Sequence, residues 1–125
     1  MWIFPKEMSE IAYKICLEKD DLDIKELITD SCWAYWYCRK VKDRPEIRER
    51  IIESGWAFHY CENVKDRSEI RDRITKSRWA YYYCRDVKDR PEIRDRITET
   101  NDAYWYCRRV KNRPEIRERI IKENI

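Results

Sequence analysis

The chain has 125 residues, which suffice for one domain or a short array of repeats but not for two ordinary domains. Charged residues make up 42% of it and aromatic residues 14%, and the formal net charge is +3. The single glycine, Gly55, excludes glycine-rich loops that bind phosphates or dinucleotides, and the single histidine, His59, excludes a zinc site built on paired histidines.

Residues 1–30 are expected to form a degenerate first unit that caps the chain. After a one-residue deletion, this segment matches the later units at Ala12, Tyr13, Cys16 and Ile24. It carries four lysines against eight acidic residues, a net charge of −4, whereas 100–122 carries seven basic and three acidic residues. The sequence is therefore acidic at its front and most basic toward its end.

Four gapless units of 23 residues follow, and they occupy 31–53, 54–76, 77–99 and 100–122. Residues 123–125 are left as a tail. Each unit predicts an aromatic helix of about eleven residues and a second helix of about nine, for a total of roughly 80% helix. The first helices are expected to be capped by the hydroxyls of Ser31, Ser54, Ser77 and Thr100. The second helices are expected to begin with capping boxes at Asp43, Asp66, Asp89 and Asn112.

Each helix of a unit has a narrow apolar stripe. In the first unit the two stripes comprise Ala34, Tyr37, Cys38 and Val41, and then Ile47 and Ile51. Neither stripe can close a core alone, so each unit must bury its apolar residues against its neighbours. The sequence therefore predicts an all-α fold, a short α-solenoid of about five two-helix repeats that forms a single domain over 1–125.

One cysteine position recurs in every unit, at Cys16, Cys38, Cys61, Cys84 and Cys107. Equivalent atoms of successive units lie about one helix layer apart, beyond the reach of a disulfide, which favours buried free thiols over a metal site or disulfides. The sixth cysteine, Cys32, falls on a more exposed face and is the better candidate for modification. Free buried thiols suit a reducing compartment, so we expect a cytoplasmic protein.

All four units share one pattern, which in the first of them reads Ala34, Tyr35, Tyr37, Cys38, Val41, Pro45 and Glu46. This pattern resembles the tandem helical repeats of about 23 residues in mostly uncharacterised proteins of bacteriophages and large DNA viruses. Those repeats usually have Ala where this chain has Cys38, and Ser68 replaces one proline here. The resemblance implies a helical-repeat fold, a viral or mobile-element origin, and an inhibitor or adaptor of a host factor in the host cytoplasm.

The positions that differ most between units lie opposite the buried stripe of the first helix. Unconstrained exposed positions usually carry Lys, Glu or Ser, yet one row here reads Trp36, His59, Tyr82 and Trp105. Aromatic rings with interspersed arginines are typical of partner-binding surfaces. The sequence thus predicts an aromatic–arginine stripe composed of Trp36, Arg39, His59, Tyr82, Arg85, Trp105, Arg108 and Arg109. Free drift of exposed positions, or packing of the row against the next unit, remains an alternative explanation.

A second set of arginines recurs identically in every unit, as Arg44, Arg48 and Arg50 in the first. Because glutamates lie between them, we interpret these arginines as members of ion pairs between units, with phosphate contacts as the alternative.

The leading hypothesis is a non-enzymatic scaffold that binds a protein through the stripe. The alternative is binding of RNA or single-stranded nucleic acid, with bases stacked on the aromatic rings and phosphates held by the arginines of the stripe, although Glu62 and Asp86 interrupt that track. No enzyme activity, cofactor or metal is expected, because the repeated acids lie among arginines that keep their pKa low. No segment approaches 18 apolar residues, so no membrane partner is expected. Apolar residues near both ends suggest a homodimer or end-to-end association.

Overall fold

A computed structural model of the chain describes residues 4–123. This part is all-α: it is 66% helical and has no strand. Its elements in chain order are α1 (Pro5–Glu18), the short 3-10 helix η1 (Ile24–Leu27), α2 (Ser31–Lys40), α3 (Pro45–Arg48), α4 (Ser54–Asn63), α5 (Ser68–Arg71), α6 (Ser77–Asp86), α7 (Pro91–Arg94), α8 (Thr100–Arg109) and α9 (Pro114–Glu123). None of these helices combines the length and the apolar character that a membrane crossing requires.

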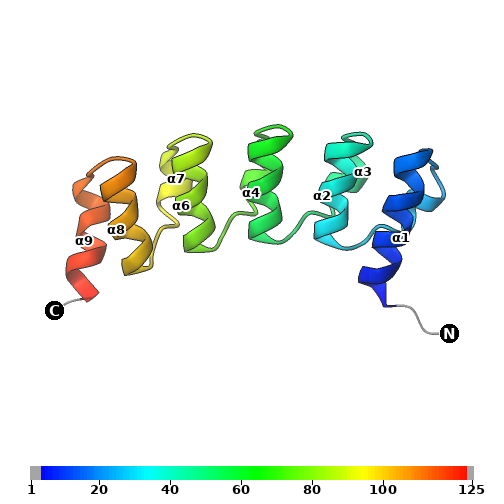
Figure 1. The fold of residues 1–125 in the computed structure, drawn as a ribbon. Helices are drawn as coiled ribbons and strands as arrows, with labels where there is room; N and C mark the ends of the chain where they lie inside the picture. Colours follow the sequence, from blue (N-terminus) through cyan, green and yellow to red (C-terminus); the bar gives the residue numbers. More distant parts are fainter. Residues whose placement is uncertain (1–3, 124–125) are drawn as a thin grey trace.

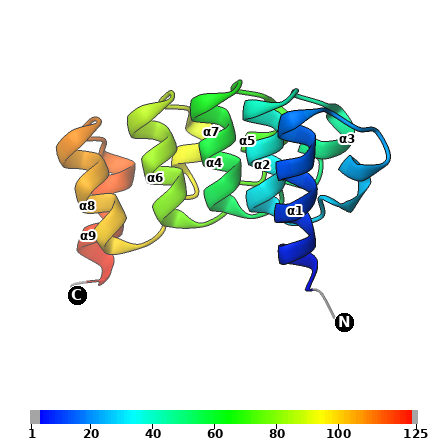
Figure 2. The ribbon, with the colours of Figure 1, turned by 45° about the vertical axis from the view of Figure 1, so that its right-hand side comes forward.

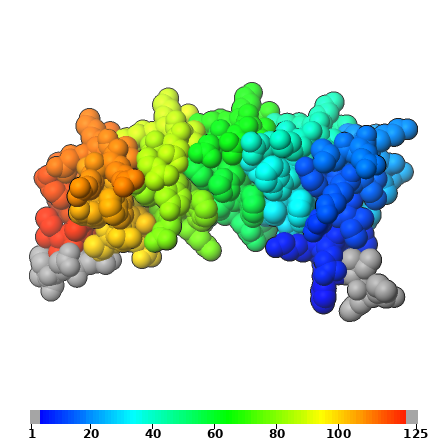
Figure 3. Space-filling model, viewed as in Figure 1, coloured from blue at the N-terminus to red at the C-terminus, as the bar shows by residue number. Residues whose placement is uncertain are grey.

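The longer helices α1, α2, α4, α6 and α8 stand side by side in chain order (Figure 1). The short helices α3, α5 and α7 lie together on one side of this row (Figures 1 and 2). The molecule is elongated, and its first and last units form opposite ends (Figure 3). Consecutive longer helices of the row contact one another, α1 with α2, α2 with α4, α4 with α6, and α6 with α8.

The second helix of each inner unit is shorter than the nine residues expected: α3, α5 and α7 have four residues each, whereas α9 has ten. After α3 the backbone tightens, since Ile51 N–H donates to the carbonyl of Arg48, three residues back, at 3.0 Å. Nη1 of Arg73 in the next unit then donates to the carbonyls of Arg48 and Ile51, at 3.0 and 2.8 Å. These carbonyls bind a side chain instead of a further helical turn, which accounts for the shorter helix. The same contact with the preceding unit is made by Arg50, Arg96 and Arg119.

The predicted hydroxyl caps are wrong. Ser54 lies inside the first turn of α4, and its Oγ donates to the carbonyl of Arg73 (3.2 Å) and accepts from Thr75 N–H (3.1 Å) near the end of its own unit. The equivalent serines Ser31 and Ser77 also accept from backbone N–H groups near the end of their own units. Each buried serine thus ties the start of the first helix to the linker that follows the second helix of the same unit. In the last unit the equivalent hydroxyl, on Thr100, is buried without a partner.

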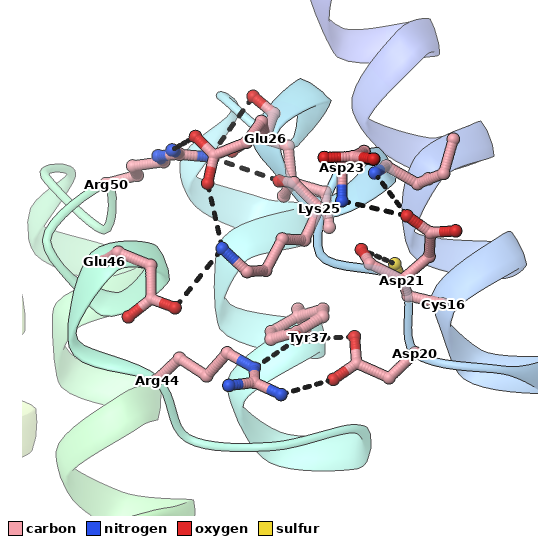
Figure 4. Close-up of polar contacts among 12 residues, drawn as sticks. Cys16, Asp20, Asp21, Asp23, Lys25, Glu26, Tyr37, Arg44, Glu46 and Arg50 are labelled. Carbon is pink, nitrogen blue, oxygen red and sulfur yellow. Dashed lines mark hydrogen bonds and ion pairs between the residues drawn. The ribbon is translucent and has the colours of Figure 1, made fainter.

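The predicted capping boxes are wrong as well, because the aspartates bind neighbouring units. At the first junction Tyr37 Oη donates to Asp20 (2.7 Å), Arg44 Nε donates to Tyr37 Oη (2.8 Å), and Arg44 Nη2 donates to Asp20 (2.7 Å), as Figure 4 shows. We call this arrangement the clamp. It recurs in Tyr60–Asp43–Arg67, Tyr83–Asp66–Arg90 and Tyr106–Asp89–Arg113, where the contacts of the tyrosine hydroxyl are as short and the arginine lies 3.1 to 3.3 Å from the carboxylate.

The interpretation of the repeated arginines as ion pairs between units is correct for Arg44 and Arg50 but wrong for Arg48, which pairs within its own unit. Arg44 belongs to a clamp, Arg50 binds carbonyls of the preceding unit, and Arg48 forms an ion pair with Asp43 of its own unit at 3.0 Å. Each guanidinium therefore holds one defined place at a junction, where a planar fork of donors suits carboxylates and carbonyls.

The core runs along the row of helices. Ala34, Tyr37 and Cys38 are buried, as are Ile47 and Ile51, in agreement with the predicted stripes. The equivalent residues of the next two units are buried too, but in the last unit Cys107 and Ile120 are only half-buried. Val41 is only half-buried. All six cysteines are free, and four of them are buried, namely Cys16, Cys38, Cys61 and Cys84.

Candidate interaction surface

The row Trp36, His59, Tyr82 and Trp105 lies on one side of the molecule because it occupies the same position on α2, α4, α6 and α8. All four side chains are half-buried. Two of them also contact the neighbouring unit, since His59 lies 6.1 Å from Tyr35 and Tyr82 lies 6.2 Å from Phe58 between ring centroids. The row is therefore partly packed and partly presented to solvent.

Arginines of the predicted stripe lie over three of these four rings. Cζ of Arg39 lies 5.4 Å from the Trp36 ring centroid and Cζ of Arg85 lies 4.8 Å from that of Tyr82. At the end of the row, Cζ of Arg109 lies 4.7 Å from the Trp105 centroid. These separations are in the range of cation–π interactions, so each guanidinium is held against an aromatic face.

The arginines have further partners on the same side. Arg39 Nη1 donates to Tyr35 Oη at 2.9 Å, and Asn63 Nδ2 of the next unit donates to the same oxygen at 3.1 Å. Arg85 donates to both carboxylate oxygens of Asp86, at 2.7 and 2.9 Å. The stripe is thus ordered, and at Arg85 a neighbouring acid partly offsets its positive charge.

A second aromatic row, which the sequence analysis left out of the site, flanks the first. Trp33, Trp56 and Trp79 are half-buried, and each packs against an aromatic side chain of the preceding unit. The ring centroids lie 5.3 to 5.6 Å apart in the pairs Tyr13–Trp33, Tyr35–Trp56 and Phe58–Trp79. The recurrence of tryptophan at one position in three units was the signal for this row.

The two rows meet at His59, which lies 5.5 Å from Trp56 and 5.6 Å from Trp79 between ring centroids. A pocket of about 630 Å³ opens beside these rings, and Gly55 forms part of its wall. A side chain at Gly55 would place Cβ 3.0 Å from the Trp79 ring. The only glycine of the chain therefore lets Trp79 lie close to the backbone of α4 at this pocket.

The repeated carboxylates and thiols lie in environments that oppose acid–base or nucleophilic chemistry. Burial raises the pKa of the Asp66 carboxyl, but hydrogen bonds from Tyr83 and Arg90 outweigh that effect, so its pKa lies below the ordinary value. Burial raises the pKa of the recurring thiols to about 12, in Cys38, Cys61 and Cys84. Within the described part of the chain, no group of three or more His, Cys, Asp or Glu side chains is placed to hold a metal ion.

Comparisons of the chain with protein-family models, with curated proteins and with solved structures gave no match.

Proposed function

We propose that the chain is a non-enzymatic scaffold, a short α-solenoid of about five repeats, that binds another protein through the aromatic–arginine stripe. The observation that carries this proposal is the row of four half-buried rings with guanidinium groups over three of them. Aromatic and arginine side chains contribute most of the binding energy at protein interfaces, because they bury a large area at low cost in conformational entropy. A phage or viral source would make a host protein the natural partner.

The pocket beside His59 supports a protein partner because it offers a place for one projecting side chain. It lies in the middle of the row, between α4 and α6, and tryptophans from both helices line it. Central, partly enclosed pockets are where interface hot spots concentrate.

Single-stranded nucleic acid is the second candidate, and the stacked arginines also suit that function. The arginines that recur identically are already engaged in clamps, carbonyl contacts and ion pairs, so phosphates would have to be bound by the stripe alone. There the pairing of Arg85 with Asp86 and the exposed carboxylate of Glu62 oppose a continuous phosphate track.

The test compares three forms of the full-length protein: wild type, the double variant Trp36→Ala/Trp105→Ala, and a control with Glu69→Ala/Glu92→Ala on α5 and α7. Circular dichroism establishes first that all three are equally helical. Immobilised protein is then exposed to a cell lysate and bound proteins are quantified by mass spectrometry, while mixed-sequence RNA and single-stranded DNA are titrated by fluorescence anisotropy.

A protein retained by wild type and control but lost from the tryptophan variant would support the proposal. Equal retention by all three forms would refute the stripe as the binding surface. Oligonucleotide binding that falls steeply with salt and disappears in the tryptophan variant would instead establish the second candidate.

A further inference from the structure

The two end faces of the molecule present the positions through which inner units bind one another. At each inner junction, a first helix contacts the preceding unit at two positions, represented by Trp33 and Tyr37. Trp33 packs on Tyr13 with ring centroids 5.3 Å apart, and Tyr37 donates to Asp20. On α1 these two positions are occupied by Ile11 and Ile15, which are 47% and 45% exposed.

The opposite end presents the complementary positions. Tyr104 on α8 is equivalent to Tyr35 and Phe58, which pack against a tryptophan of the following unit, but Tyr104 is 42% exposed. Asn112 stands where each inner unit has the aspartate of a clamp. Beside them lies a pocket of about 280 Å³ whose wall comprises Tyr104, Cys107, Arg108, Asn112, Arg117 and Ile120.

The residues that replace clamp residues at one end of the molecule are compatible with those that replace them at the other end. A clamp needs a tyrosine hydroxyl, an arginine and a carboxylate, and the first unit lacks two of these, because Ile15 replaces the tyrosine and Asp21 stands at the arginine position. A carboxylate facing Ile15 and Asp21 would be unpaired and repelled, which is costly when it is removed from water. The uncharged amide of Asn112 at the other end avoids that cost.

The net charges of the two end units are also complementary. Residues 1–30 have a net charge of −4, and residues 100–122, with seven basic and three acidic residues, have a net charge of +4. A two-fold contact would bring like charges together at either end, whereas a head-to-tail contact pairs opposite charges.

We propose that the α1 face binds the α8–α9 face of a second copy of this chain, so that molecules associate head to tail in open rows. Ile11 and Ile15 contact Tyr104 and the adjoining pocket, in the register of the inner junctions. This association is distinct from binding at the four rings of the aromatic–arginine stripe, although Arg108 of the stripe forms part of the wall of the end pocket. The contact is about as large as one junction, so it forms at high protein concentration and weakens with salt.

The test uses one variant of each face in the full-length protein. Ile15→Lys adds a positive charge to the α1 face, and Tyr104→Asp adds a negative charge to the α8–α9 face. Ile52→Lys is the matched control, because Ile52 is 70% exposed but lies at an inner junction. Mass is measured by sedimentation equilibrium and light scattering up to about 1 mM protein at low salt, after circular dichroism shows that each variant is folded.

Wild type and Ile52→Lys are expected to show a mass that rises with concentration. Each face variant alone is expected to stay monomeric, and an equimolar mixture of the two is expected to stop at a dimer, because each retains one intact face. The proposal is overturned if wild type is monomeric throughout, if either face variant still associates by itself, or if the mixture remains monomeric.

Discussion

Removal of a single hydroxyl from a central clamp, by Tyr83→Phe, probes how the units are joined. Tyr83 is fully buried, and its Oη donates to Asp66 at 2.8 to 2.9 Å and accepts from Arg90 Nε at 2.8 Å. Phenylalanine keeps the ring and leaves no cavity, so the loss is that of two hydrogen bonds to charged groups, each worth about 1.5–3 kcal/mol. Because Arg90 and Asp66 remain paired at 3.1 Å, we expect a net loss of about 2–3 kcal/mol.

The free energy of unfolding is measured by urea titration followed by circular dichroism, and the melting temperature should fall by about 10 °C for a chain of this size. Tyr104→Phe is the control, since the Tyr104 hydroxyl accepts from Arg108 at an exposed edge, and its removal should change stability by less than about 0.5 kcal/mol. If the two variants lose the same stability, or neither loses any, the clamp does not join the units.

Three further predictions concern thiols, the last junction and pH. Cys32 and Cys107 should react with a thiol reagent at pH 8 well before Cys38, Cys61 and Cys84, because the pKa of about 12 of these three buried thiols keeps them protonated until unfolding. Simultaneous reaction of all five thiols would contradict this. Asp102 is 5% exposed and stands where three earlier units carry tryptophan. Asp102→Trp should stabilise the protein by about 1–2 kcal/mol, because the new ring can pack on Tyr81. A lower melting temperature of the variant would refute that reasoning. The four clamp carboxylates have a pKa in the folded protein below the unfolded value of about 3.9. The stability they contribute is therefore present above that pH and is lost as the pH falls through the folded pKa. Urea midpoints that do not change between pH 7 and about pH 2 would contradict this prediction.

The sequence predicted the helical class, the buried positions and the free thiols because these follow from periodicity within one unit. It failed where a side chain binds a partner far along the chain, in its own unit or in the next. Asp43 and Ser54 have the residue types and spacing of helix caps, yet both bind partners 17 or more positions away in sequence, which no local pattern reveals. The second helices are short for the same reason, since Arg73 captures the carbonyls that a longer helix would use.

The candidate surface was only partly predictable. The row that contains Trp36 and His59 was found because its residue types are unusual for exposed positions. The pocket at Gly55 was not found, because it depends on how the Trp79 ring of the next unit lies against α4. The position of the arginine side chains over the aromatic rings was not predictable either, because it depends on side-chain rotamers and not on spacing in the sequence.

Deletion of one whole internal unit, residues 54–76, tests most directly whether equivalent junctions hold the chain together. The deletion joins unit 31–53 to unit 77–99, and the clamp can then form again from Tyr83, Arg90 and Asp43, as it does at every inner junction. We predict a folded protein with the same helical content per residue and a cooperative thermal transition. A chain that loses its helical circular dichroism signal and melts without a transition would contradict the account, because its units would then not be interchangeable neighbours.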